Sequence, residues 1–452
     1  MKQIDFSGEN TRRNMIRSVG PMLIAQVLNL LYSIVDRVYI GRVQGEGTLA
    51  LGGIGICFPV IILITAFTNL YGVGGAPLCA IERGKGERDE AERIMNQSFR
   101  LLILTGVILM IIGLIFCEPI LYLFGASDVT IKYAASYLRI YLIGTLASMT
   151  AAGLNPFINA QGYALTGMLT IFIGTVANII LDPIFIFVFG MGVAGAAIAT
   201  VISQCLSAFY VIAFLRGSKA ELKLIRHTPF DRKLSANIIS LGFASFVMQC
   251  TNSVVSIVCN HVLSQYGDLY VSAMTIVSSV RQILDTPVGA IADGASPMLS
   301  FNYGARRYSK VRYSIRLVTT WAVGYTIIIW ALILLFPAAF IGIFNSEPTL
   351  LGIAIPALHM YFFAFVFQAF QYSGQTVFKS LNKKKRAIFF SLFRKIVLVV
   401  PLTLLLPRFN GLGASGVFIA EPISNFVGGT ACYVTMLLTI IPELKAKSAA
   451  KS

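Results

Sequence analysis

An acidic side chain stands inside an apolar stretch at Asp182, in the run NIILDPIFIF (residues 178–187). An ionised carboxylate in apolar surroundings is costly unless it is paired, hydrated or protonated. Pro183 has no N–H, so it predicts a bend in the helix and a freed carbonyl oxygen at Ile179. Asn178 shares a helix face with Asp182. These oxygens could hold Na⁺ or a transferable proton; the alternative is that Asp182 stabilises the kink by bonding to a neighbouring helix.

Other ionisable side chains are rare in the apolar stretches, and each is a candidate for function. Asp36, in SIVDRVYIG, has an alternative structural role in an ion pair with Arg37 or Arg42. Glu421 precedes Pro422 in an apolar segment. This position predicts a separate acidic site in the second half of the chain.

Three more charges, Arg281, Asp285 and Asp293, lie in one apolar segment. The first two are four residues apart, so on a helix they can neutralise each other. Structural and functional interpretations of all three stay open. His261 and His359 do not have metal-ligand spacing, and the seven cysteines form no CxxC pair. We therefore predict neither a metal cluster nor a disulfide framework.

The segments that carry these residues are longer and more apolar than a soluble core requires. Of the 452 residues, 56% are hydrophobic and 12% are charged, whereas soluble proteins have about 25% charged residues. About 20 apolar residues cross a bilayer as a helix. We predict an all-α integral membrane protein with twelve transmembrane helices, at about residues 16–40, 50–81, 97–117, 131–153, 164–189, 193–215, 236–263, 270–300, 315–341, 350–378, 387–406 and 412–441.

The net charge of +16 indicates orientation rather than a nucleic-acid partner. Most of the 36 lysines and arginines fall in six segments that share one side of the membrane if the helices alternate. This is the positive-inside pattern, which predicts that both termini are cytoplasmic. The six segments are the N-terminal tail, 82–100, 216–233, 306–316, 379–395 and the tail after Glu443.

The two halves of the chain repeat each other. QVLNLLYSIV (26–35) matches QCTNSVVSIV (249–258), and GVAGAAIATVIS (192–203) matches GASGVFIAEPIS (413–424). Each half holds six predicted helices, so both enter the membrane in the same orientation. Such parallel repeats are typical of transporters. We expect two pseudo-symmetric six-helix lobes about an axis normal to the membrane, comprising residues 1–225 and 226–452.

The acids are distributed unequally over this repeat. Both Asp36 and Asp182 belong to the first half, which makes it the expected cation site. Glu421 belongs to the second half alone. The repeat pairs Asp36 with Cys259, Asp182 with about Thr403, and Thr200 with Glu421.

Two glycine motifs have a structural explanation. Both GMGVAG (190–195) and GLGASG (411–416) match the dinucleotide pattern G-x-G-x-x-G, but membrane-length apolar runs flank them where a strand is required. We interpret them as tight turns before helices that pack through small residues. No phosphate-binding loop of the Walker type occurs. The sequence therefore predicts transport driven by an ion gradient and no enzymatic activity.

The two six-helix halves, with SIVDRVYIG, NIILDPIFIF and GVAGAAIAT, resemble the multidrug and toxic compound extrusion (MATE) family, most nearly its prokaryotic DinF-like and MepA-like members. The resemblance covers essentially the whole chain. It implies two lobes around a central cavity and export of amphipathic, often cationic compounds in exchange for Na⁺ or H⁺, without another cofactor. It places the cation site, and Na⁺ where that is the coupling ion, at Asp36, Asn178, Asp182 and Thr200, with Asn155 nearby.

The resemblance also ranks the remaining candidates. Arg281 resembles an eighth-helix arginine of the DinF-like group. Independently of the resemblance, the positions of Asp293, Glu421 and Pro183 in apolar segments make them supporting candidates for the substrate cavity. Some members carry acids in the seventh and tenth helices, and this chain has Cys259 and His359 in those segments. Coupling through acids of the C-terminal lobe is therefore in question.

Alternatives come from the same wider superfamily and from other classes. A lipid-linked oligosaccharide flippase would show extra helices and a markedly basic cavity, which here only Arg37, Arg139 and Arg281 could line. Another metabolite carrier would not require the buried acids and amide of the first half, and a channel or receptor would not require the repeat. We expect a monomer in the prokaryotic plasma (inner) membrane, with lipids and small drugs as partners and no nucleic acid.

Overall fold

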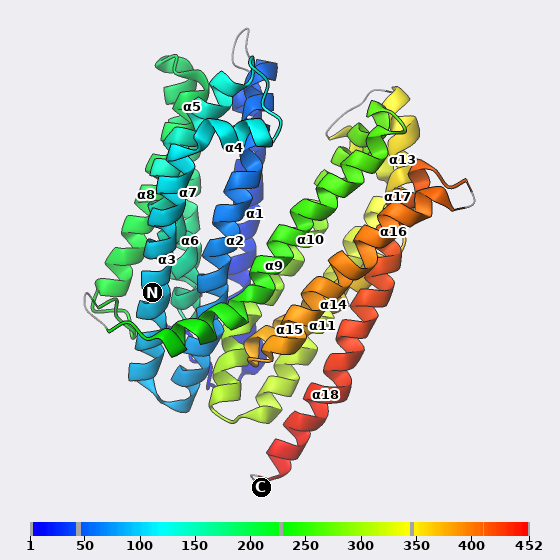
Figure 1. Cartoon of the computed structure of the whole chain (residues 1–452). Helices are drawn as coiled ribbons and strands as arrows, with labels where there is room; N and C mark the ends of the chain where they lie inside the picture. The colour runs from blue at the N-terminus through cyan, green and yellow to red at the C-terminus, as the bar shows by residue number, and fades with distance from the viewer. Residues whose placement is uncertain (1–2, 42–46, 226–228, 344–347, 410, 451–452) are drawn as a thin grey trace. The chain divides into compact units, whose positions relative to one another are not determined.

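The computed structural model describes residues 3–41, 47–225, 229–343, 348–409 and 411–450. Within these ranges, the side chains of residues 33, 34, 36–38, 40, 41, 47–52 and 268 lie outside the description. Every regular element in the described residues is a helix (Figure 1). The chain forms two compact units. Unit 1 comprises residues 1–6 and 20–246, and unit 2 comprises residues 7–19 and 247–452.

Unit 1 is a bundle in which α2 packs against α3 and α6, and α7 packs along α8. The boundary predicted at 225/226 falls between α8 and α9, whereas the units divide inside α9. The elements are α1 (Thr11–Gly41), whose first residues belong to unit 2, α2 (Gly47–Lys85), α3 (Arg88–Ile115), α4 (Cys117–Leu123), α5 (Ile131–Ile143), α6 (Thr145–Ala160), α7 (Ala164–Pro183), the π-helix η1 (Ile184–Val188), α8 (Gly192–Arg216) and the first part of α9 (Arg232–Ser264).

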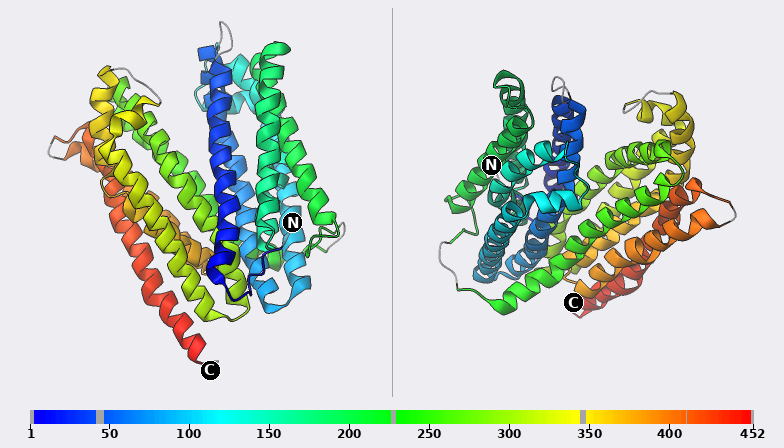
Figure 2. Two further views of the ribbon diagram at one scale, coloured as in Figure 1. Left: turned by 180° about the vertical axis from the view of Figure 1, so that it is seen from behind. Right: turned by 45° about the horizontal axis from the view of Figure 1, so that its top comes forward.

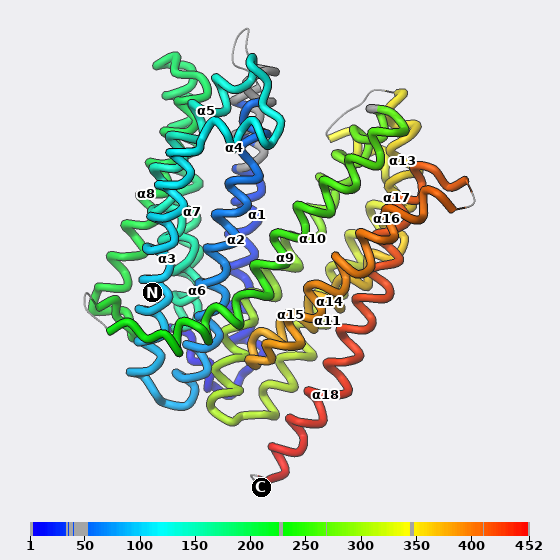
Figure 3. Tube along the Cα trace, in the orientation of Figure 1, coloured from blue at the N-terminus to red at the C-terminus, as the bar shows by residue number. Residues whose placement is uncertain are grey.

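Unit 2 is a second bundle, in which α10 packs against α11, α13 and α14, and α17 packs against α13 and η2. The span formed by α15, η2 and α16 is continuous along the trace (Figure 3). The elements after α9 are α10 (Asp268–Gly304), α11 (Tyr308–Leu335), α12 (Pro337–Gly342), α13 (Pro348–Phe362), α14 (Val366–Ser380), α15 (Lys384–Leu392), η2 (Phe393–Val399), α16 (Val400–Leu405), η3 (Leu406–Arg408), α17 (Ala414–Ser424), η4 (Asn425–Gly429) and α18 (Thr430–Ala449).

Nine helices of the described chain are long and apolar enough to cross a membrane, and a tenth span results if the bent pair α13 and α14 is counted as one. The protein is therefore a multi-pass membrane protein. Two of the predicted spans are not among these: 131–153, which the structure divides at Gly144 between α5 and α6, and 270–300, which lies in the charge-bearing α10. The total of twelve stays a prediction.

The long helices turn apolar side chains outward, as lipid requires. On α3, Leu104, Ile108, Ile111 and Ile115 recur at helical spacing and are all exposed, while Ala91, Asn96 and Gln97 on the other side are buried. An apolar side chain has about the same free energy against lipid as against protein, so helix contacts do not depend on apolar burial. Small and polar residues can therefore form these contacts. The helices α7 and α8, which lie side by side (Figure 2), make contacts of this kind: Gly174 lies against the hydroxyl of Ser207, which donates to the carbonyl of Thr170 at 2.9 Å.

Regular α-helix ends at Pro183 and continues as the π-helix η1. The bend predicted at this proline stays a prediction. Proline cannot donate the i to i−4 hydrogen bond. Beyond it, the N–H of Phe189 donates to the carbonyl of Ile184 at 2.9 Å, one residue farther than in an α-helix. Two more π-helices, η2 and η4, lie in unit 2. Such segments occur frequently at functional sites.

A polar anchor holds the loop between α8 and α9 at one end of unit 1. The guanidinium of Arg83 donates to Glu221 at 2.6 Å and 2.8 Å, and Gln3 donates to the same carboxylate oxygen at 2.6 Å. Burial acts to raise the pKa of Glu221, but the hydrogen bond and charge of Arg83 outweigh it and hold the pKa below its usual range. The carboxylate therefore supports the fold as an anion.

We predict that Gly242→Ala lowers the thermal stability of unit 1. The helices α2 and α9 cross so closely there that an added Cβ at Gly242 would overlap the carbonyl oxygen of Leu70, and one at Gly74 would lie 2.6 Å from that of Ile238. Overpacking of this kind costs about 1–3 kcal/mol. The measurement is thermal unfolding of the purified protein in detergent.

Gly324→Ala is the matched control on α11, because no heavy atom lies within 4 Å of its added Cβ. Alanine is favoured over glycine in a helix by about 0.5–1 kcal/mol, so this variant should unfold at the same or a higher temperature. Equal melting temperatures of Gly242→Ala and wild type would show that the crossing is not close-packed.

Candidate functional site

Three polar side chains meet in the apolar interior of unit 1, where α7 packs along α8. The amide Nδ2 of Asn178 lies 3.2 Å from Oδ1 of Asp182 and 3.4 Å from the hydroxyl of Thr200. The first pair is four residues apart on α7 and so shares one face. Asp182 is 0% exposed and Asn178 is 2% exposed. The structure thus brings together three of the four residues of the predicted cation site.

The side-chain oxygen of Asn178 is a further possible ligand for a cation in this group. Among the described residues, its Oδ1 has no hydrogen-bond partner although the side chain is buried. An amide oxygen, a carboxylate and a hydroxyl are the hard oxygen ligands that alkali and alkaline-earth cations take. The same carboxylate can instead accept a proton. The residues present therefore fit either coupling ion.

The side chain of Asp36 lies outside the described residues, so its position is not part of the observed group. Neighbouring features do place α1 beside η1, because the rings of Tyr39 and Phe187 lie edge to face with centroids 6.2 Å apart. Unit 2 offers a parallel: the repeat counterparts of Asp36 and Asp182 are Cys259 and Thr403, and their sulfur and hydroxyl lie 3.9 Å apart.

Asn155, which the resemblance places near the cation site, lies elsewhere in the structure. Its amide donates to the hydroxyl of Thr170, and to the carbonyl of Gly167 at 2.7 Å. Thr170 precedes Asp182 by twelve residues on α7, which is about 18 Å along a helix. Asn155 instead joins α6 to the start of α7, where it also accepts a hydrogen bond from Asn159 at 3.0 Å.

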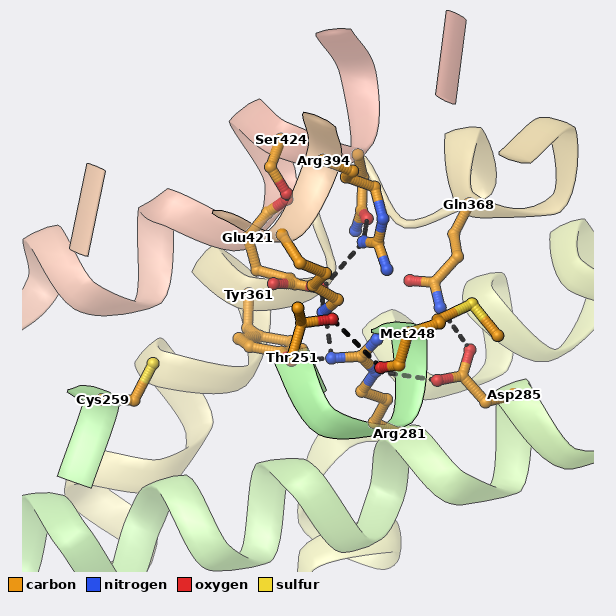
Figure 4. Close-up of polar contacts among 12 residues, drawn as sticks. Met248, Thr251, Cys259, Arg281, Asp285, Tyr361, Gln368, Arg394, Glu421 and Ser424 are labelled. Atoms are coloured by element: carbon orange, nitrogen blue, oxygen red, sulfur yellow. Dashed lines mark hydrogen bonds and ion pairs between the residues drawn. The ribbon is translucent and has the colours of Figure 1, made fainter. Parts of the chain in front are cut away.

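Unit 2 contains a cluster of buried charges centred on Glu421 of α17. One carboxylate oxygen, Oε1, lies 3.0 Å from Nη1 of Arg394, 3.0 Å from Nζ of Lys395 and 3.1 Å from Nη1 of Arg281. The side chains of Glu421 and Lys395 are 4% and 3% exposed. Figure 4 shows Arg281 and Arg394 converging on the carboxylate. The predicted acidic site of the second half is therefore an ion-paired centre with more bases than acids.

Arg281 connects Glu421 to a second carboxylate. Its Nε donates to Asp285 at 2.8 Å, and its Nη1 donates to the hydroxyl of Tyr361 at 2.8 Å. Gln368 donates to the other oxygen of Asp285 at 2.6 Å. The side chains of Arg281 and Asp285 are 17% and 21% exposed, so this pair forms the accessible side of the cluster. We call Arg281, Asp285, Arg394, Lys395 and Glu421 the charge cluster.

The sequence interpretation missed Arg394 and Lys395 because it counted them in the basic cytoplasmic segment 379–395. The structure buries both within η2, in the interior of a span. A signal was present: Arg394 follows seven residues without a charge, AIFFSLF, which amount to about two helical turns from Arg386. A charge two turns inside an apolar run belongs with the helix rather than with the loop.

A glycine makes room for this arrangement. A Cβ added at Gly428 of η4 would lie 2.8 Å from Cγ of Arg394. The guanidinium is held by Asn425, also of η4, whose Oδ1 accepts from Nη1 at 2.5 Å. The two π-helices η2 and η4 pack against each other and so position the arginine over Glu421.

Asp293 stays apart from the charge cluster. Its side chain is exposed on α10. No ion pair or hydrogen bond to it occurs within the described part of the chain. Lys379 of α14 is a charged side chain that acts on it electrostatically. The role predicted for Asp293 in the substrate cavity stays a prediction.

The chain is similar to known transport proteins over nearly its whole length. The family model described as MatE matches residues 21–184 and 244–405. Two proteins named multidrug export protein MepA are 23% identical over 439 residues (Staphylococcus saprophyticus; 96% of this chain, 94% of the relative) and 25% identical over 352 residues (Staphylococcus haemolyticus; 77% of each). Among solved structures, an outward-facing multidrug resistance MATE family transporter has the same fold, with a TM-score of 0.91 at 23% identity and 99% coverage of both chains.

We predict that Glu421→Gln strongly destabilises the protein. The neutral amide leaves the buried cations of the charge cluster without their shared counter-charge, and breaking a buried ion pair from one side costs about 3–5 kcal/mol. The measurement is the free energy of unfolding in detergent, from titration with sodium dodecyl sulfate.

Glu118→Gln is the matched control, because it removes the carboxylate that meets Arg139 at 2.6 Å with both side chains about half exposed. Exposed pairs contribute about 0–1 kcal/mol. A similar small loss for both variants would mean that Glu421 is not the counter-charge on which the cluster depends.

Proposed function

Because the chain belongs to the MatE family, we propose that it is a multidrug efflux antiporter, which exports amphipathic and cationic compounds across a bacterial plasma membrane in exchange for H⁺ or Na⁺. The observation that carries this proposal is the buried group of Asn178, Asp182 and Thr200. A carboxylate at this depth is retained only at a considerable energetic cost. The MepA names of the relatives support export of drugs as the task.

Asp36 completes the proposed cation site. The contact of Tyr39 with Phe187 supports this, because Tyr39 lies one turn beyond Asp36 on α1. The contact between Cys259 and Thr403 supports it too, because the same repeat positions in unit 1 hold the two aspartates. Two carboxylates, an amide and a hydroxyl would then surround the ion.

The proposed mechanism is competition between coupling ion and substrate during alternating access. A ligand shifts a conformational equilibrium only by binding one state more tightly than the other. Regular α-helix ends at Pro183, next to Asp182, and the π-helix η1 follows. Binding of the ion neutralises the carboxylate at this junction, so the ion can bind more tightly to one conformation of η1 than to another. Pro21 of α1 marks a second point at which the helix can bend.

The alternative of a lipid-linked oligosaccharide flippase gains no support from the basic residues that the structure adds. Arg394 and Lys395 point to Glu421 rather than forming a free basic lining. The same proteoliposomes that measure dye export can be assayed for lipid movement.

We predict that Asp182→Asn lowers gradient-driven ethidium efflux from proteoliposomes by more than about ten-fold, because the neutral amide removes the charge that binds the coupling ion. The ΔpH and the Na⁺ gradient are imposed separately, at matched amounts of reconstituted protein. Asp128→Asn, in the exposed turn between α4 and α5, serves as control and should transport like wild type. Wild-type efflux by Asp182→Asn under both gradients would refute the scheme.

A second substitution separates the two ions. Thr200→Val removes the hydroxyl beside Asn178, and we expect Na⁺-driven efflux to fall about ten-fold, since a bond to a charged group contributes about 1.5–3 kcal/mol. Thr200→Ser keeps the hydroxyl and should retain Na⁺-driven efflux. If valine and serine variants transport equally well in a Na⁺ gradient, the hydroxyl is not a ligand.

A further inference from the structure

The charges of the charge cluster do not balance. Two guanidinium groups, Arg281 and Arg394, face two carboxylates, Asp285 and Glu421. Guanidinium groups stay charged in proteins, so these four groups cancel one another. Lys395 is the fifth group and would add a positive charge without a counter-charge. An uncompensated charge inside an apolar bundle is costly.

The contacts of Lys395 fit an amine that can lose this charge. Its Nζ has one acceptor among the described residues, Oε1 of Glu421 at 3.0 Å. An ammonium group has three N–H donors, and two of them would have no acceptor there. A neutral amine needs only one acceptor for its hydrogen bond. Unlike an arginine, a lysine can take this form in the interior of a protein.

We propose that Lys395 is a proton-binding group of unit 2, and that its proton and a cationic substrate held at Asp285 exclude each other through Arg281. The inference rests on the proposed function, for which it supplies a second coupling element. The N-terminal cation site and Lys395 belong to different units, so each can be altered without the other.

Arg281 provides the connection because it binds both carboxylates at once. When Lys395 carries a proton, Glu421 has two cations from η2, and Arg281 is free to neutralise Asp285 fully. When Lys395 is neutral, Glu421 draws more strongly on Arg281 at 3.1 Å, and the charge of Asp285 is less compensated. Asp285 is the more accessible carboxylate, so it then attracts a cation.

Other groups near Lys395 do not carry this titration. The other titratable side chains that face the charge cluster from the surrounding elements are Cys259 of α9, Tyr361 of α13, Tyr372 of α14 and Cys432 of α18. Thiols and phenols of this kind are neutral at physiological pH. The carboxylates of Asp285 and Glu421 each face a guanidinium, which favours their charged form. The amine of Lys395 is therefore the site that the proton enters.

The test measures binding of tetraphenylphosphonium, a permanent cation, to the purified full-length protein in detergent from mildly acidic to mildly alkaline pH. All variants are made in the Asp182→Asn background, so that the remaining pH dependence belongs to unit 2. In this background we expect affinity to fall about ten-fold on acidification, a size typical of coupling between two ligands. Calorimetry in two buffers should show release of up to about half a proton for each cation bound, at a pH between the pKa values of the free and the cation-bound protein, which is the release that a ten-fold coupling allows.

Two substitutions then mimic the two states. Lys395→Met has no proton to bind, so its affinity should stay high at every pH without proton release. Lys395→Arg is permanently charged, so its affinity should stay low at every pH. Lys385→Met makes the same exchange at an exposed lysine of α15 and should behave like the background. Asp285→Asn should bind weakly at every pH.

Each outcome decides the question. The proposal fails if tetraphenylphosphonium affinity in the Asp182→Asn background does not depend on pH. It also fails if the methionine and arginine variants keep the pH profile of that background. If Lys395→Met does not fold, Lys395→Arg and Asp285→Asn still distinguish a pH-independent affinity from the background profile. Failure of the proposed function would look different: the wild type would not drive dye export with either gradient.

Discussion

Charged groups inside a hydrocarbon layer must be compensated by the protein itself, and this constraint decides how each unit is built. Water is not available there to solvate a carboxylate or a free backbone group. The outward surface of α3 is accordingly apolar, while amides, hydroxyls and ion pairs are gathered between helices. Where Pro183 removes a donor, the chain does not open to the lipid but continues as a π-helix with its own hydrogen bonds. Irregular helix geometry therefore accompanies the polar side chains.

The two units meet this constraint in different ways although they are repeats of each other. Unit 1 pairs its acid, Asp182, with the amide of Asn178, which also contacts the hydroxyl of Thr200. A neutral amide stabilises an anion without cancelling its charge. Unit 2 holds Glu421 at the position that corresponds to Thr200 and gives it three cations. An acid supported by neutral groups can still attract a cation from solution. An acid already paired with several cations cannot, and its surroundings respond in other ways.

Much of this arrangement could be predicted from local sequence. Residues four apart on a helix share a face, so Asn178 with Asp182, and Arg281 with Asp285, could be paired without a structure. Contacts between helices could not be derived in this way. The place of Thr200 in the site was predicted through family resemblance alone. Arg394 and Lys395 were not predicted as buried residues, because they follow the lysines and arginines of a loop closely in the sequence. Asn155 was expected near Asp182, but it contacts the start of α7. The sequence indicates that a side chain is polar and does not indicate which turn of a neighbouring helix it contacts. The helix α10 is less apolar than the spans for a related reason: it carries the charged side chains of Arg281, Asp285 and Asp293.

The difference between the units has a physical consequence for how they could share the work of transport. A site with neutral partners exchanges its cation directly, so its occupancy follows the concentration of the ion on the side to which the site is open. A closed cluster of charges exchanges nothing but a proton, because only a proton can enter without displacing a side chain. Within such a cluster, arginine fixes charge and lysine can change it. Since Arg281 links the buried Glu421 to the partly exposed Asp285, a change in the protonation of Lys395 in η2 would alter how far the charge of Asp285 is compensated.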